Sequence, residues 1–574
     1  MSRGEGAAAA RAAGGAVLGA ALLAKVLSLW VVPVASVPAA LRLGLDDLAL
    51  ALGLATVLAP APRWLARAVA VLMVAFLAAN VVLERALGVP MLRSMWVGVD
   101  PAMADSAWLY VSPANAGLVL AVLLAAACGA RLGARVHCPA ATSALACLAC
   151  IGLLAVLPAP AHVVHRNAAV ALVRSLLPRA APAPPVGAGE PVLVAAATAS
   201  PLEAWRGVAR GRSVVFVVLE SAAARFVDGD GPTAMPYLAS LAHAGLDCRT
   251  AYAVYPESIE GQVPIFCALP PKPDGEPTDY GEHARLALPH RLASHGYTSA
   301  LFHAGRFRFL GMQHVLAPMG FDVLADAGTI GGEAESSFGI DEEATVDALL
   351  RWVGSLPAER PFLACYLPIA GHHPYASPEG GPCPTDTPLG CYENALHYAD
   401  RALRRLWSGV CALRPADRLL LCVVGDHGEA FGEHAGNFGH SFELYEENLR
   451  VPLVFHAPGT AMTGLVTDAV CSHLDVVPTL LDLLGLPVAD SLLRRPLHGG
   501  RAQAFTDWGE LLVMARDGDL KLVREVASGR EHLFDLSADP GERQDLAPSR
   551  PEAAACLRGQ ALRFLAATGR APAR

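Results

Sequence analysis

Two apolar runs in this chain end abruptly at side chains that bind metal ions. Residues 213–219 (SVVFVVL) lead into Glu220, and residues 419–424 (LLLCVV) lead through a glycine into Asp426 and His427. Continuous apolar runs of this length are typical of buried parallel strands. In open α/β sheets, ligands bind at the carboxyl ends of such strands. We therefore expect Glu220, Asp426 and His427 to share one metal ion, which indicates an enzyme.

Two further predicted strands, over 298–302 and 361–367, also end in polar side chains that could meet an anion. These side chains are His303, Arg306, Arg308, His372 and His373. A single ending of this kind is usually only a solvated loop. Four endings of compatible chemistry at one edge of a sheet favour a common site.

A candidate nucleophile lies between the first two of these strands. Ser258, in the segment 255–261 (YPESIEG), stands where a turn enters a predicted helix over 259–269. The partial positive charge of a helix N-terminus favours a hydroxyl that must become anionic. A divalent metal ion would activate the hydroxyl further. The alternative is that Ser258 only caps the helix.

Predicted strands and helices alternate from residue 210 onward. Strands are predicted over 213–219, 298–302, 361–367, 419–424 and 451–455, and helices over 235–244, 286–295, 342–354, 392–410 and 476–484. Beyond residue 501 a smaller unit is predicted, with strands over 512–515 and 521–526 and a helix over 551–567. This alternation predicts a layered α/β domain with a mostly parallel central sheet and a small C-terminal subdomain.

The first 160 residues are strongly apolar and predict a transmembrane domain of about five helices. The chain is 53% hydrophobic with a mean hydropathy of +0.39. Candidate spans are 15–37, 45–58, 64–82, 117–133 and 141–157, of which the second and fifth are short for a bilayer core that needs about 20 residues. The flanking arginines place the catalytic domain outside the cytoplasm by the positive-inside rule.

These patterns divide the chain into four expected parts: a transmembrane domain (1–160), a juxtamembrane helix and linker (161–209), a catalytic core (210–500) and a C-terminal subdomain (501–574). Residues 162–177 mix cations and apolar residues at helical spacing, and 178–191 are rich in Ala and Pro.

The net charge of −9 argues against a nucleic-acid partner. Of the 13 cysteines, Cys383 and Cys391 flank a short Pro/Gly loop and are the candidate disulfide.

Several sequence segments resemble the alkaline phosphatase/sulfatase superfamily. They include VVFVVLES (214–221), YPESIEG (255–261), GDHGEAFGEH (425–434) and YEENLRVPLVFHAPG (445–459), and with others they are spread over nearly all of 210–550. The resemblance is strongest to the membrane-anchored branch that contains lipoteichoic acid synthases, phosphoglycerol transferases and phosphoethanolamine transferases. It implies a sulfatase-like fold.

The resemblance implies one divalent ion, Zn or Mn by ligand type with Mg or Ca as alternatives, held by Glu220, Ser258, Asp426 and His427. Ser258 would be the nucleophile, where related transferases usually have threonine. The residues expected to contact the substrate are His372, His440, Arg308 or Arg306, His303 and, more weakly, His434. His434 has the alternative role of orienting its loop, and His373 is expected to be a supporting residue.

The expected activity is transfer of a phospho-head group, phosphoglycerol or phosphoethanolamine, from a phospholipid to an envelope glycan or lipid through a phospho-serine intermediate. The enzyme would be a multi-pass protein of the bacterial plasma membrane. Ser258 is followed by Ile259-Glu260-Gly261-Gln262, with neither the Pro nor the Arg of the formylglycine frame in place, which argues against a formylglycine sulfatase.

Residues 532–547 nevertheless resemble a sulfatase C-terminal segment. The alternative activity is therefore hydrolysis of sulfuric or phosphoric esters on cell-surface glycans. A third reading, a catalytically inactive anchor or sensor, is disfavoured by the complete ligand set.

Overall fold

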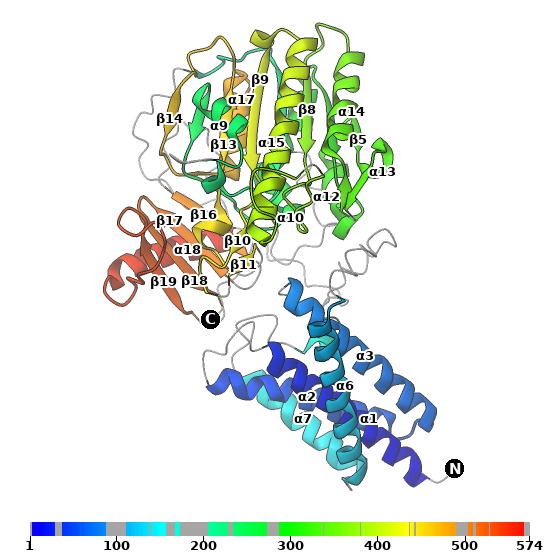
Figure 1. Ribbon diagram of the computed structural model, residues 1–574. Coiled ribbons are helices and arrows are strands. Elements are labelled where there is room, and N and C mark those ends of the chain that lie inside the picture. Colours follow the sequence, from blue (N-terminus) through cyan, green and yellow to red (C-terminus); the bar gives the residue numbers. More distant parts are fainter. Residues whose placement is uncertain are drawn as a thin grey trace. The chain divides into compact units, whose positions relative to one another are not determined.

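The computed structural model divides the chain into a helical unit, made mainly of residues 1–181, and an α/β unit, made mainly of residues 182–574 (Figure 1). It describes residues 3–28, 37–87, 111–136, 139–156, 167–170, 172, 205–227, 233–271, 286–336, 338–378, 380–435, 437–440, 443–488, 503–508, 512–526 and 529–567. The predicted linker over 178–191 and most of the predicted juxtamembrane helix over 162–177 lie outside these residues.

The α/β unit is built on an eight-stranded sheet with the order β14-β2-β13-β9-β1-β8-β4-β5. Its strands are β1 (Ser213–Leu219), β2 (Leu246–Cys248), β4 (Thr298–His303), β5 (Val323–Ala325), β8 (Phe362–Leu367), β9 (Leu419–Gly425), β13 (Leu453–His456) and β14 (Leu465–Thr467). β13 pairs antiparallel with both of its neighbours, and the other pairings are parallel. The predicted α/β fold with a mostly parallel sheet is confirmed.

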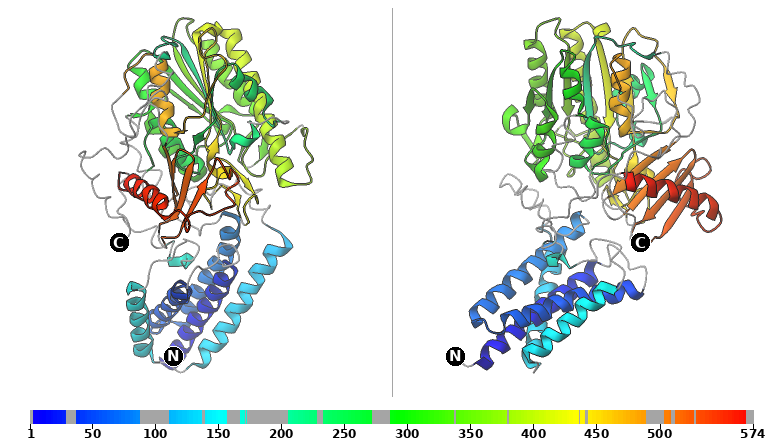
Figure 2. Two further views of the ribbon diagram at one scale, coloured as in Figure 1. Left: turned by 90° about the vertical axis from the view of Figure 1, so that its left-hand side faces the viewer. Right: turned by 180° about the vertical axis from the view of Figure 1, so that it is seen from behind.

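Helices cover both faces of this sheet (Figure 2), which explains why its central strands are apolar at every position. Val214, Phe216 and Val218 of β1 face one core, and the alternate residues of the strand face the other. The first core includes α10 (Ser258–Cys267), α11 (Leu288–Ala293), α12 (Met312–Leu316) and α17 (His473–Leu483). The second includes α9 (Pro236–His243), α14 (Glu342–Ser355) and α15 (Pro388–Leu413).

A second, four-stranded sheet forms the C-terminal part of the α/β unit. It contains β16 (Gln503–Trp508), β17 (Leu512–Asp517), β18 (Leu520–Glu525) and β19 (Glu531–Asp535), with α18 (Pro551–Ala567) packed against it. β16 contacts the segment that leads to Ser258, because Asp507 N donates to Val254 O at 3.1 Å.

Some predicted boundaries and one predicted bond differ from the structure. The strand predicted over 451–455 is interrupted at Pro452, which cannot donate to a ladder, so β12 (Arg450–Val451) and β13 are separate. The predicted Cys383–Cys391 disulfide is wrong for this structure, since both thiols are free. Cys391 lies in the first turn of α15 with its thiol 3.5 Å from Thr385 O.

The helical unit contains α1 (Arg3–Ser28), α2 (Val37–Leu58), α3 (Arg63–Leu87), α6 (Pro113–Arg135) and α7 (Ala140–Val156) among the described residues. Helices therefore occupy the positions of all five predicted spans, although α1 begins earlier and ends at Ser28 rather than near residue 37. Three of them, within α1, α3 and α6, are long and apolar enough to cross a membrane. α2 carries Asp46 and Asp47, and α7 has only 17 residues.

Glycines bring α1 and α6 into backbone contact. Gly15 and Gly19 of α1 face Gly129 and Gly133 of α6, each pair spaced by four residues. A Cβ on Gly129 would lie 2.1 Å from Gly15 O, closer than any atom can approach. Small residues at this spacing allow helices to pack closely where the hydrophobic effect between them is weak.

We predict that Gly129→Ala destabilises the helical unit, because its methyl group would force the two backbones apart at a cost of about 1–3 kcal/mol. Gly117→Ala is the matched control on the same helix, since a Cβ there meets no described atom within 4 Å. Thermal unfolding of both variants in detergent micelles measures the effect. Equal midpoints would show that the glycine contact does not hold α1 against α6.

Candidate active site

The parallel pairing of β1 and β9 sets the centre of the site. In their register Leu219 lies beside Gly425, so that Glu220 and Asp426 follow side by side. The connection is tied by two hydrogen bonds: Asp426 N donates to Leu219 O at 3.0 Å, and Ser221 N donates to Asp426 Oδ1 at 2.8 Å. Ser221 adopts a left-handed backbone with φ 54°, an uncommon conformation for a residue with a side chain. The two carboxyl groups are thereby fixed at one edge of the sheet.

Glu220, Asp426 and His427 converge as the sequence predicted. One potential ligand atom of each lies within 4.8 Å of the others, and all three residues are buried. His427 Nε2 is 3.8 Å from Glu220 Oε1 and 3.6 Å from Asp426 Oδ2. His427 Nδ1 lies 3.0 Å from Gly428 O, to which it can only donate. Nε2 is therefore the nitrogen available to bind a metal ion.

Ser258 is the first residue of α10 and completes this group. Its Oγ donates to Glu220 Oε1 at 2.9 Å and lies 3.1 Å from His427 Nε2. Glu257 caps the helix through Glu260 N at 3.0 Å, so Ser258 is not the residue whose side chain supplies the cap. Glu257 therefore has the N-cap role that was the alternative for Ser258. The Ser258 hydroxyl instead faces the Glu220 carboxylate and the His427 imidazole.

The donor set suits a divalent cation. Burial raises the pKa of Asp426 to about 7 even though backbone N–H groups of Ser221 and His427 donate to it. Burial lowers the pKa of His427 to about 4, which leaves its imidazole neutral and able to ligate. The group brings together two carboxylates, an imidazole and a hydroxyl, and none of these side chains supplies positive charge. A bound cation would stabilise the ionised carboxylates. These residues fit a metal ion such as Zn or Mn by ligand type.

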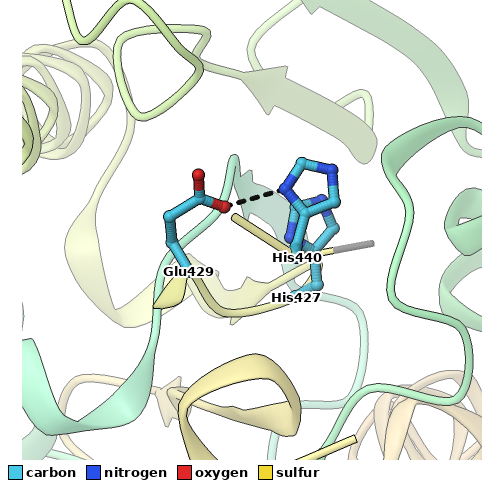
Figure 3. A group of neighbouring side chains, drawn as sticks. All are labelled: His427, Glu429 and His440. Atoms are coloured by element: carbon cyan, nitrogen blue, oxygen red, sulfur yellow. Dashed lines mark hydrogen bonds and ion pairs between the residues drawn. The ribbon is translucent and has the colours of Figure 1, made fainter. Parts of the chain in front are cut away.

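A second histidine lies against this group (Figure 3). The His440 ring stands 4.0 Å from the His427 ring between centroids, and its Nδ1 is 2.8 Å from Glu429 Oε2. Burial opposes the charged form of His440, but Glu429, Glu220 and Asp426 outweigh burial and raise its pKa to about 9. The surroundings of the predicted substrate residue His440 therefore favour its protonated form, and its ring lies against the predicted metal ligand His427.

His303 and His372 lie on the other side of Glu220. His303 is buried at the end of β4, with Nδ1 3.1 Å from Leu367 O and its ring stacked on Phe307. Burial lowers its pKa, although Glu220 acts in the opposite direction. His372 is partly exposed and packs against Phe338 with ring centroids 4.2 Å apart. Neither imidazole belongs to the candidate metal groups found among the described residues, so substrate contact by both stays a prediction.

The two predicted arginines follow β4, and only one of them is partly buried. Arg306 is partly buried, with its Nε shielded from solvent and without a hydrogen-bond partner among the described residues. Arg308 is exposed at the start of a short 3-10 turn. His373 is exposed and its ring lies 5.5 Å from that of Tyr375, which agrees with a supporting position.

His434 is held away from the metal group by the C-terminal part of the unit. Its Nδ1 lies 2.6 Å from Glu447 Oε1, its Nε2 lies 3.2 Å from Glu542 O, and its ring stacks on Tyr445 at 3.6 Å. Glu542 and Glu446 in turn contact the buried Lys521 Nζ, each at 2.9 Å. This geometry favours the loop-orienting alternative for His434 over substrate contact.

Two residues of the site were given no role from the sequence. Glu429 stands two positions after His427 in the GDHGE segment, and Tyr375 follows the His372-His373-Pro374 segment. Tyr375 OH donates to Glu429 Oε1 at 2.6 Å. Its position in the sequence, two residues after the predicted metal ligand His427, could have indicated Glu429 as a site residue. No local pattern indicates Tyr375, because its contact is made 54 residues away along the chain.

Comparison with known proteins shows which proteins the domain resembles. Residues 212–486 match the sulfatase family model. Lipoteichoic acid synthase 2 of Bacillus subtilis (strain 168) is 25% identical over 320 residues, which cover 51% of this chain and 48% of that protein. Choline-sulfatase of Rhizobium meliloti (strain 1021) is 32% identical over 165 residues, or 26% of this chain and 31% of that protein. The chain spans about half or less of the length of these curated relatives.

Solved structures show the same fold. The lipoteichoic acid synthase LtaP from Listeria monocytogenes superimposes with a TM-score of 0.54 at 19% identity, covering 66% of this chain and 97% of that chain. A protein of the alkaline phosphatase superfamily from Vibrio parahaemolyticus gives 0.52 at 18% identity, covering 62% and 86%. The predicted resemblance to the alkaline phosphatase/sulfatase superfamily is confirmed.

We predict that Mn²⁺ stabilises the chelator-treated protein against heat, by about 2.7 kcal/mol when its concentration is 100 times the dissociation constant. Asp426→Asn should lose most of this stabilisation, because it removes a buried carboxylate of the donor set. Glu333→Gln, at an exposed carboxylate, is the control. Thermal unfolding with and without Mn²⁺ measures the difference. Equal stabilisation of all three proteins would place the ion elsewhere.

Proposed function

Because residues 212–486 form a sulfatase-family domain, we propose that the protein is a metal-dependent phosphotransferase anchored in a membrane by its N-terminal helices. The enzyme moves a phospho-head group, phosphoglycerol or phosphoethanolamine, from a phospholipid to a glycan or lipid of the cell envelope. The observation that carries the proposal is the position of Ser258 Oγ, 2.9 Å from Glu220 and 3.1 Å from His427. A hydroxyl in contact with a metal-ligand set is an activated nucleophile.

A divalent metal ion held by Glu220, Ser258, Asp426 and His427 would supply positive charge to the nucleophile and to the phosphoryl oxygens. The Ser258 hydroxyl gives its proton to Glu220 Oε1, which already accepts its hydrogen bond. Ser258 Oγ then bonds to phosphorus while the bond between phosphorus and the diacylglycerol oxygen breaks. The departing oxygen takes a proton, for which His440 and His372 are the candidate donors.

The second half of the reaction restores Ser258. An acceptor hydroxyl attacks the phospho-serine and gives its proton to the histidine that protonated the departing oxygen. The bond between phosphorus and Ser258 Oγ breaks, Ser258 Oγ takes back its proton from Glu220 Oε1, and the head group leaves on the acceptor. While it is protonated, His440 offers positive charge to the equatorial oxygens, and Arg306, His303 and His372 follow strands that end at the same edge of the sheet. Charge stabilisation of this kind supplies most of the catalysis in phosphoryl transfer.

Membrane anchorage supports a lipid donor. Helices at the N-terminus are long and apolar enough to cross a bilayer, and the arginines that flank them favour a catalytic domain outside the cytoplasm. The proposed location is the bacterial plasma membrane. An enzyme whose donor stays in the bilayer benefits from being held there. Likeness to lipoteichoic acid synthases supports a phospholipid donor over a soluble one.

The second candidate is a hydrolase of sulfuric or phosphoric esters on cell-surface glycans. It is favoured by the likeness to choline-sulfatase and to arylsulfatases. The residues after Ser258 oppose a formylglycine sulfatase, because Glu260 and Gln262 stand where its site would need Pro and Arg. Water in place of the acceptor hydroxyl would turn the same site into a phosphodiesterase.

We predict a covalent head-group adduct on Ser258 after incubation with Mn²⁺ and a mixed phospholipid extract. Intact-mass spectrometry of the purified protein detects it, and the added mass identifies the head group. Ser258→Ala should carry no adduct, while Ser355→Ala, at an exposed serine, should match the wild type. An adduct that persists in Ser258→Ala would contradict the proposed nucleophile.

The products distinguish the two candidate activities. The transferase should release diacylglycerol from phospholipid and leave soluble sulfate esters intact. Release of inorganic sulfate from aryl or choline sulfate, with no diacylglycerol from lipid, would establish the hydrolase instead. Both are measured on the full chain in mixed micelles, with Ser258→Ala as the background.

A further inference from the structure

We propose that Tyr375 and Glu429 are positioning residues that hold the His440 imidazole against the nucleophile. The inference rests on the proposed function for what His440 does there. The geometry itself consists of two successive hydrogen bonds, from Tyr375 OH to Glu429 Oε1 at 2.6 Å and from His440 Nδ1 to Glu429 Oε2 at 2.8 Å. Glu429 is buried, so each of its carboxylate oxygens has one defined partner.

A small hairpin brings Glu429 and His440 together. β10 (Ala430–Phe431) pairs antiparallel with β11 (Phe438–Gly439), with Ala430 opposite Gly439. Glu429 directly precedes the first strand and His440 directly follows the second. The two side chains therefore emerge opposite each other, and the hairpin sets their separation independently of any ligand.

Tyr375 reaches this hairpin from a different part of the sheet. It follows β8 by a turn in which Tyr375 N donates to His372 O at 2.8 Å, and its backbone is left-handed with φ 61°. Its ring is enclosed by Tyr392 and Phe431, with centroids at 5.3 Å and 5.8 Å. Unusual backbone conformations persist where surrounding contacts demand them and gather at functional sites. Here the conformation points the phenol at Glu429.

The consequence is a fixed orientation for His440. With Nδ1 committed to Glu429, Nε2 is the free nitrogen, and it has no hydrogen-bond partner within the described part of the chain. The ring lies against that of His427, with centroids 4.0 Å apart (Figure 3). His427 Nε2 in turn lies 3.1 Å from Ser258 Oγ. A carboxylate behind a histidine is a common device for fixing the tautomer and direction of a functional imidazole. The phenol fixes the carboxylate in turn.

The same three side chains, His427, Glu429 and His440, are also close enough to hold a metal ion between them. In the positioning role Glu429 Oε2 and His440 Nδ1 stay bonded to each other and hold no second metal ion. The two readings differ in the amount of metal bound, which makes them separable by experiment.

The test uses the full chain in detergent micelles with Mn²⁺ and a chromogenic nitrophenyl phosphodiester as the probe. We expect Tyr375→Phe to lower kcat about tenfold and Glu429→Gln about a hundredfold, with the bound Mn²⁺ per chain unchanged. Tyr297→Phe is the matched control, since it also loses a phenol hydrogen bond of 2.8 Å, to Arg212 O at the opposite edge of the sheet.

Two further measurements separate positioning from loss of folded protein. In a His440→Ala background, Tyr375→Phe should have no additional effect on kcat, because it acts only through His440. The dissociation constant of inorganic phosphate should rise severalfold in Tyr375→Phe, whereas partial unfolding would reduce the number of sites and leave affinity unchanged.

Full additivity of the two substitutions, unchanged phosphate affinity, or loss of bound Mn²⁺ in Glu429→Gln would each overturn the inference. If the wild type turns over no phosphodiester, the proposed function fails, and phosphate affinity alone decides whether Tyr375 positions His440.

Discussion

The in-register pairing of β1 with β9 is the constraint on which the site depends. It places Glu220 and Asp426 next to each other at the ends of two buried strands, where water cannot solvate them. Neither strand can shift by one residue without turning its apolar side chains to the wrong core. The hydrophobic pattern that folds the sheet therefore also fixes the distance between the two carboxyl groups. His427 follows directly, and α10 brings Ser258 to the same point.

Charge explains how the rest of the site is arranged around this pair. Glu220, Asp426 and Glu429 are buried close together, and His440 is the neighbouring cation. A single imidazolium does not neutralise three carboxylates, so a divalent ion in the Glu220–Asp426–His427 group accounts for what remains. The balance also assigns different tasks to the two histidines. In the proposed mechanism the neutral His427 binds the metal ion, whereas the protonated His440 faces the phosphoryl group. The division follows from the carbonyl behind one ring and the carboxylate behind the other.

The sequence predicted what local pattern determines and missed what depends on loops. The apolar runs ending at Glu220 and Asp426 were visible because their burial on both faces leaves no polar position. The edge strands β5 and β14, and β2 beside β14, have three residues each, too few to show a period. The close contact of α1 with α6 rests on four glycines whose meaning appears only when the helices are paired. Tyr375 could not be assigned, because its role requires the turn after β8 to point it at Glu429. For His434 the sequence left substrate contact and loop orientation open, and its partner Glu542, 108 residues away along the chain, could not be read from a local pattern.

The central claim is that one divalent ion sits among Glu220, Ser258, Asp426 and His427, with His440 outside its coordination shell. Anomalous diffraction at the manganese absorption edge, from crystals of the full chain grown with Mn²⁺, tests it most directly. The account predicts a single peak in this part of the molecule, within bonding distance of those four side chains. A peak between His440 and Glu429, or none beside Ser258, would contradict it.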